Sequence, residues 1–143
     1  MPFLNQLNLI TDRTQEDVLL QNSKGIYSAD DLNRVESAVK TLLTRAISLG
    51  TRLPLVIKTD WILSGYPSPN TPTESQMQRY LENIRSLCQA VALQCALPAS
   101  MHGFGYEDAN SIEGALLLAE KRIYALLSCL RFSGELYSGD EIL

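Results

Sequence analysis

The residues that could carry out nucleophilic catalysis are few and lie far apart in the sequence. The single histidine, His102, lies in the loop 100–103, and a base assists a nucleophile only when it stands directly beside it. Ser64, Ser100 or a cysteine would qualify only if the fold brought it to this imidazole. No G-x-S-x-G turn or other catalytic signature is present. We therefore predict no catalytic residues and expect His102 to be a solvated loop side chain.

The three cysteines and the histidine raise the question of a metal site. Cys88, Cys95 and His102 follow one another at intervals of seven residues, whereas zinc ligands usually come in pairs about two to four residues apart. Cys88 and Cys95 also fall on the apolar stripe of a predicted helix, where free cysteine behaves as a small hydrophobic residue. An odd number of widely spaced cysteines is not a disulfide pattern. The sequence predicts three buried free thiols, including Cys129, with no metal and no cofactor.

Carboxylates are abundant near the last long helical segment, at Glu107, Asp108, Glu113 and Glu120. Acidic residues in a first helical turn are explained by the helix dipole. A glycosidase pair would need a cleft between its two carboxylates, and no pattern here indicates one. Glycine-rich phosphate loops and H-E-x-x-H are also missing from the sequence. We therefore expect a protein that is not an enzyme.

Aromatic and apolar side chains near helix ends, in loops and in the C-terminal tail are the candidate interface. Tyr and Trp favour interfaces, so one interpretation is a surface that contacts a protein or a saccharide. The other interpretation is a second small core that seals one end of the fold. Apolar residues after the last predicted helix need a surface to cover them, and we expect a terminus to contribute to a subunit interface. The candidate residues are Trp61, Tyr66, Phe104, Tyr106, Leu136, Tyr137, Ile142 and Leu143.

Four segments with helical spacing of apolar side chains must position these residues. Thr14, Ser28 and Thr73 are suitable N-caps for the first three, because each precedes the apolar run and has a polar partner three residues later. The predicted helices are 15–23, 29–49, 74–94 and 107–132. The last is expected to stop at Ser133-Gly134-Glu135, where the chain would return against the other helices.

The apolar stripe of each long helix is narrow, so each helix must bury one face against the others. Short connections favour antiparallel neighbours. We therefore predict a mainly α fold: an antiparallel bundle of three long helices plus one short helix, forming a single domain over residues 1–143. The irregular segment 51–72 would lie across one end of the bundle, with residues 55–57 as a short strand or as extended chain.

Arg34 lies in the first turns of the helix predicted at 29–49. A bidentate pair with Asp12 or Asp60 would tie a neighbouring loop to this helix. The alternative is an ordinary solvated helix face, since exposed ion pairs contribute little. The sequence alone leaves both interpretations open.

The composition is that of a typical globular chain, with 143 residues and a net charge of −4. A nucleic-acid surface would need a basic stripe, so we expect no nucleic-acid partner. No apolar run approaches the roughly 20 residues that cross a bilayer, and the N-terminus has no signal-peptide pattern. These features predict synthesis in a cytoplasm and no membrane insertion.

Seven stretches in this chain, in this order, resemble a protein family encoded by phages and prophages of Firmicutes. The strongest are Asp-Leu-Asn-Arg-Val-Glu at 31–36, Thr-Asp-Trp at 59–61 and Ser-Gly-Glu-Leu-Tyr-Ser-Gly at 133–139. The others are ITDRTQEDV (10–18), TESQMQRYLENIRSL (73–87), LPASM (97–101) and YEDANSIEGALL (106–117). Genes of this family typically lie in the tail and host-recognition region.

The resemblance implies a virion structural component of the phage tail: a baseplate, fibre or adaptor subunit that acts through protein–protein contacts. It would be made in the bacterial host cytoplasm and assembled into the virion tail. The implied partners are other phage tail proteins, and a homo-oligomer is a further option. A second interpretation is a receptor-binding module that contacts a cell-surface glycan through loop aromatics such as Trp61 and Tyr66. The family offers no catalytic residues to carry over.

Overall fold

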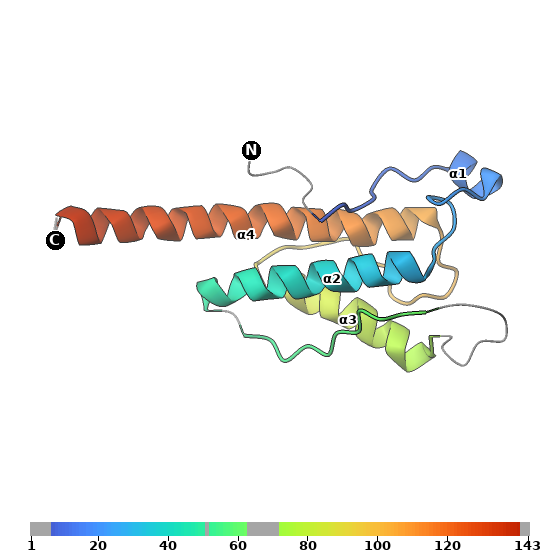
Figure 1. The fold of residues 1–143 in the computed structure, drawn as a ribbon, viewed down its shortest axis with the longest axis horizontal. Coiled ribbons are helices and arrows are strands. Elements are labelled where there is room, and N and C mark those ends of the chain that lie inside the picture. Colours follow the sequence, from blue (N-terminus) through green and yellow to red (C-terminus); the bar gives the residue numbers. More distant parts are fainter. Residues whose placement is uncertain (1–6, 51, 63–71, 141–143) are drawn as a thin grey trace.

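The computed structural model describes residues 7–50, 52–62 and 72–140, with side chains described as far as residue 130. Its elements are α1 (Gln15–Leu20), α2 (Ala29–Ala46), the 3-10 helix η1 (Ile47–Leu49), α3 (Glu74–Ala90) and α4 (Tyr106–Asp140). The three long helices α2, α3 and α4 pack together, as Figure 1 shows. The predicted mainly α bundle is therefore confirmed.

The long helices run in the same direction, which differs from the antiparallel arrangement predicted from sequence. Arg34 and Arg45 on α2 pair with Glu113 and Glu120 on α4, in the same order along both helices. Figure 1 shows α3 beginning at the same end of the bundle as α2 and α4. The prediction assumed short connections. The connections before α3 and before α4 are long enough to return along the bundle, because extended chain advances about 3.3 Å per residue and a helix only about 1.5 Å.

The helix starts follow the predicted caps. The Thr14 and Thr73 hydroxyl oxygens each accept a hydrogen bond from the backbone N–H three residues later, and the partner side chain accepts from the backbone N–H of the cap residue. At α2 the Ser28 backbone N–H donates to Asp31 Oδ2 at 2.7 Å. Gly50, with φ of 85°, ends the α2–η1 helix where the sequence predicted.

The helix ends of α3 and α4 differ from the prediction. α3 stops at Ala90 because Ala92 adopts a left-handed conformation with φ of 58°, four residues before the predicted end. α4 continues through Gly134 to Asp140. A glycine inside a helix costs only about 1 kcal/mol relative to alanine, so it does not by itself end a helix.

The core lies between the three long helices and contains the predicted stripes. On α2 it includes Leu32, Val35, Val39, Leu42 and Ala46, and on α3 Leu81, Ile84, Leu87 and Cys88, followed by Val91 just after the helix. On α4 the last buried stripe position among the described side chains is Ile123, and Leu126 and Leu130, which continue the same helical spacing, are exposed. Each fully buried Leu or Ile contributes about 1.5–3 kcal/mol.

α4 is much longer than its neighbours. Its 35 residues span about 52 Å, whereas the 18 residues of α2 span about 27 Å. Figure 1 shows the orange-to-red helix running on alone after α2 and α3 have ended. We call residues 124–140 the α4 extension, because they follow the last buried position of the stripe.

The segment 52–62 is extended chain and contains no assigned strand. It leaves η1 and runs back along the bundle toward the start of α3, as Figure 1 shows. Residues 55–57 belong to this extended stretch, so the predicted alternative of extended chain is the one found. Trp61 near its end is buried.

Candidate functional site

The run Asp31–Glu36 connects α2 to most of the molecule. Leu32 and Val35 point into the core, while the polar residues between them hold other segments. The Asn33 side chain bonds both backbone groups of Trp61, accepting from its N–H at 2.7 Å and donating to its carbonyl oxygen at 2.9 Å. The run Asp31–Glu36 is therefore a structural junction.

Glu113 on α4 is fully buried and saturated with donors. Its Oε1 accepts from the Ile10 backbone N–H at 3.0 Å and from Arg34 Nε at 2.8 Å. Its Oε2 accepts from Arg34 Nη2 at 2.8 Å and from Arg13 Nη2 at 2.5 Å. Asp31 Oδ1 also accepts from both guanidinium groups. Two arginines and two carboxylates thus form a cluster that joins the N-terminal segment, α2 and α4, with Arg13, Asp31 and Glu113 buried and Arg34 partly buried.

Arg34 makes the bidentate pair that the sequence suggested, but with a different partner. It pairs with Glu113 and not with Asp12 or Asp60, which contact Lys24 and Lys58 respectively. Burial alone would lower the pKa of the Arg34 guanidinium, but its hydrogen bonds to Glu113 and Asp31 outweigh burial and raise it. The paired Arg34 side chain links α2 to α4, which argues for a structural role.

Glu36 is the centre of a second cluster of hydrogen bonds and is itself buried. Its Oε2 accepts from the Trp61 indole N–H at 2.5 Å, and its Oε1 accepts from the Lys58 backbone N–H at 3.1 Å. Arg79 on α3 donates to both carboxylate oxygens, at 2.8 and 3.1 Å. This second cluster fastens the extended segment 52–62 against α2 and α3.

The predicted interface aromatics fall into different places. Trp61 is 3% exposed and belongs to the core, so it does not present a surface for a partner. Phe104 is half-buried with its ring edge-on to Tyr27 at 4.9 Å, which agrees with the small-core interpretation. Tyr106 begins α4 and is half-buried. Tyr66, Ile142 and Leu143 lie outside the described residues.

Leu136 and Tyr137 lie within α4, and not in a tail after the last helix as predicted. Their backbone belongs to the α4 extension, which carries them away from the bundle in Figure 1. The position of the two residues in the sequence therefore assigns them to a helix that leaves the bundle.

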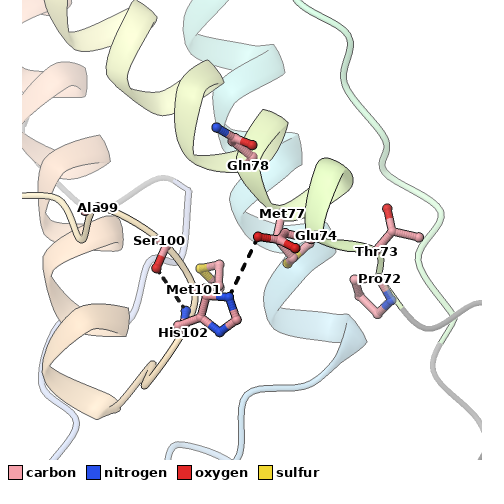
Figure 2. Close-up of a pocket in the computed structure, with 9 residues that line it drawn as sticks. All are labelled: Pro72, Thr73, Glu74, Met77, Gln78, Ala99, Ser100, Met101 and His102. Atoms are coloured by element: carbon pink, nitrogen blue, oxygen red, sulfur yellow. Dashed lines mark hydrogen bonds and ion pairs between the residues drawn. The ribbon is translucent and has the colours of Figure 1, made fainter.

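His102 lines an open hollow of about 340 Å³ between the start of α3 and the loop before α4. Figure 2 shows its imidazole facing Glu74, with Nε2 3.8 Å from a carboxylate oxygen. The Ser100 hydroxyl accepts from the His102 backbone N–H at 3.2 Å, so it is not paired with the imidazole. Both His102 and Glu74 are more than four-fifths exposed. Among the described residues, no serine or cysteine side chain makes the hydrogen bond to this imidazole that would activate it as a nucleophile, and Ser64 lies outside them.

The cysteines do not share one environment. Cys88 is buried and Cys95 half-buried, with their sulfur atoms 3.1 Å apart. Cys129 is exposed on the α4 extension, so the prediction that it is buried is wrong. Within the described part of the chain, no group of three or more His, Cys, Asp or Glu side chains is arranged to hold a metal ion.

The exposed surface with the most distinct character is the start of the α4 extension. Residues 124–130 contain no charged side chain, and six of the seven are apolar. Tyr124, Leu126 and Leu130 are 44%, 37% and 53% exposed, and an open hollow lies beside Leu127. A helix segment that is apolar around its circumference is normally buried. The apolar spacing continues here, but the bundle leaves Leu126 and Leu130 exposed.

No protein-family model, curated protein or solved structure matches this chain. None of the helices among the described residues combines the length and apolar character needed to cross a bilayer.

Proposed function

We propose that this chain is a structural assembly subunit that docks onto a neighbouring protein through the α4 extension. The observation that carries the proposal is the uncharged stretch 124–130, where Leu127 still packs against the core but Tyr124, Leu126 and Leu130 are exposed. Monomeric proteins rarely leave continuous apolar surface in water unless it binds something.

The spacing of the apolar residues indicates what kind of partner fits. Leu116, Ala119, Ile123, Leu126 and Leu130 alternate at intervals of three and four residues, which is the pattern of a helix seam. The first three positions of this seam are already packed against the bundle, and the last two continue it into solvent. A helix or an apolar groove of another subunit would extend the same packing.

The rigid base of this helix supports the same role. Glu113, Arg34, Arg13 and Asp31 fasten α4 to α2 and to the N-terminal segment through buried charge pairs. A docking helix that is held firmly at one end loses less conformational freedom when its other end binds. The bundle would then serve to hold and orient the α4 extension.

The resemblance to phage tail-region proteins suggests the setting. We propose that the neighbouring protein is a component of a phage tail, such as a baseplate or fibre protein. The saccharide-binding alternative has less support, because Trp61, its leading residue, is buried with its indole N–H bound to Glu36.

The test is co-expression of the full chain with the products of its neighbouring genes, followed by capture of the complex. We expect Leu126→Glu combined with Leu130→Glu to abolish capture while the circular dichroism spectrum stays helical. The matched control is Leu19→Glu combined with Leu20→Glu on α1, which places two charges on other exposed leucines. Loss of capture in the α1 variant with normal capture in the α4 variant would refute the proposal.

A further inference from the structure

Cys88 and Cys95 are brought together by the turn that ends α3. If the helix continued, their Cα atoms would be about 10 Å apart, because seven residues rise about 1.5 Å each. Instead, Ala92 turns left-handed, its N–H donates to the Gln89 carbonyl at 3.0 Å, and the Leu93 N–H donates to the Cys88 carbonyl at 2.9 Å. This hydrogen-bond pair is the Schellman motif. It folds the following chain back on the helix and leaves the two sulfur atoms 3.1 Å apart.

We propose that Cys88 and Cys95 are a redox-active dithiol that closes to an intramolecular disulfide by exchange with a small-molecule disulfide such as oxidised glutathione. Both cysteines are free thiols in the structure. A disulfide bond is about 2.05 Å long, so closure needs the two sulfurs to move only about 1 Å. The third cysteine, Cys129, is exposed on the α4 extension and takes no part in the proposed exchange.

The different burial of the two thiols sets the order of the exchange. Cys95 is half-buried and reachable from solvent, whereas Cys88 is 2% exposed. Burial, together with the neighbouring Cys95, raises the pKa of the Cys88 thiol to about 12, so Cys88 is the poorer first nucleophile. Cys95 is therefore the residue that meets the oxidant.

The reaction proceeds in two displacements. The Cys95 thiolate attacks one sulfur of the small disulfide, forms a mixed disulfide and displaces one thiolate. Cys88 then attacks the Cys95 sulfur, forms the protein disulfide and displaces the second thiolate. The two protons lost by the cysteines are taken up by the two released thiolates. The protein dithiol is thereby oxidised, and the small disulfide is reduced to two thiols.

Closure would fasten the turn after α3. The bond would link the last turns of the helix to the start of the connection that leads to α4. Leu93 and Leu97, on either side of Cys95, pack against the core. The disulfide would therefore hold this packed segment in place, and we expect the oxidised chain to melt at a higher temperature than the reduced chain.

The test uses the full chain carrying Cys129→Ser, which leaves a single pair of thiols. After incubation with oxidised glutathione, we expect a mass lower by two hydrogens, no bound glutathione and complete loss of alkylation by iodoacetamide in denaturant. The matched control is the same chain with Cys88→Ser, in which Cys95 should retain one glutathione. Peptide mapping of the wild-type chain provides a readout that does not depend on any variant.

Three results would overturn the proposal. One is a stable glutathione adduct on Cys95 when Cys88 is present. Another is a chain in which both thiols remain open to alkylation after prolonged exposure to the oxidant. The third is a disulfide that forms equally fast in native and urea-unfolded chain, because folding would then contribute nothing to closure. The outcome of this disulfide test does not depend on whether the α4 extension docks onto a partner.

Discussion

Glu113 and Glu120 are two buried carboxylates on the same helix with different surroundings. Glu113 accepts four hydrogen bonds from three residues, two of them arginines. Glu120 is 3% exposed, its Oε1 accepts no hydrogen bond, and its Oε2 is 3.5 Å from Arg45. Removing one partner of a buried charge cluster leaves uncompensated charge, whereas replacing a poorly paired buried charge with an apolar group is often neutral or stabilising.

We therefore predict opposite effects for two substitutions on α4. Glu113→Ala should lower the free energy of unfolding by about 3–5 kcal/mol, because it leaves Arg13 and Arg34 without their main counter-charge. Glu120→Met should change the free energy of unfolding by less than about 1 kcal/mol or increase it. Urea denaturation measures both. The exposed Glu82→Ala is the control, with an expected effect within about 1 kcal/mol. Equal losses for Glu113 and Glu120 would contradict this assignment.

Tyr27 and Tyr80 predict a fall in stability at alkaline pH. Their hydroxyl oxygens are 2.5 Å apart, and burial raises the pKa of both above the ordinary value of 10.0. Below pH 10.0 the two tyrosine hydroxyls are protonated in both the folded and the unfolded chain, so their contribution to the free energy of unfolding is fully present. As the pH rises further, tyrosines of the unfolded chain lose protons while the folded ones keep theirs. The free energy of unfolding should then fall, by up to about 1.4 kcal/mol per pH unit for each tyrosine.

The measurement is urea denaturation between pH 9 and pH 11, values chosen to bracket the ordinary tyrosine pKa of about 10. Replacing Tyr27 and Tyr80 together with phenylalanine should make the alkaline fall shallower than in the wild type, whatever the effect on stability at neutral pH. The remaining tyrosines and lysines are common to both chains and cancel in the comparison. An identical dependence on pH in the two chains would show that these hydroxyls are not the cause.

At the residue scale, the sequence predicted side-chain faces better than partners. The spacing of Leu32 and Val35 placed both in the core, and Arg34 beside them was correctly a candidate for a bidentate pair. The partner, Glu113, is 79 residues away in the sequence. No local pattern identifies a contact across such a distance. For the same reason, the bond from Trp61 to Glu36 could not be predicted, and a buried tryptophan resembled a surface one.

At the scale of elements, the turn after α3 offers a direct test. Ala92 has φ of 58°, a region in which a Cβ costs about 1–2 kcal/mol. We predict that Ala92→Gly raises the free energy of unfolding by about 0.5–1 kcal/mol, after the entropy lost by glycine is deducted. Thermal denaturation measures the change. Ala90→Gly, at a helical position two residues earlier, should instead lower stability, and a loss of stability in Ala92→Gly would contradict the left-handed turn.

Helix starts were predictable from sequence and helix ends were less so. Thr14 and Thr73 form local hydrogen bonds that depend only on residues three positions away. The end of α3 depends on an alanine in a conformation that glycine favours, which sequence patterns do not signal. At Gly134 the sequence predicted a helix end that the structure does not have, because a glycine can mark a helix end or be tolerated inside a helix. The parallel arrangement follows from connection length and not from the helices themselves.

At the scale of the whole molecule, the parallel arrangement of α2, α3 and α4 places the ends of the shorter helices at one side of the bundle. The longest helix leaves the bundle on that side, as Figure 1 shows. The ion pairs of Glu113 lie toward the opposite end, where α4 begins. The molecule therefore consists of a bundle and the α4 extension, which projects from it. The uncharged stretch 124–130 is the part of the α4 extension nearest the bundle.

The reactivity of Cys129 tests most directly whether the α4 extension is an assembly surface. This thiol is exposed in the isolated chain and lies within the apolar stretch. Pulse labelling with N-ethylmaleimide, followed by peptide mass spectrometry, reports on Cys129 separately from Cys88 and Cys95. We predict rapid labelling of Cys129 in the isolated chain and strong protection in the captured complex. Equal labelling rates at Cys129 in the isolated chain and in the captured complex would contradict the claim that the α4 extension is covered on assembly.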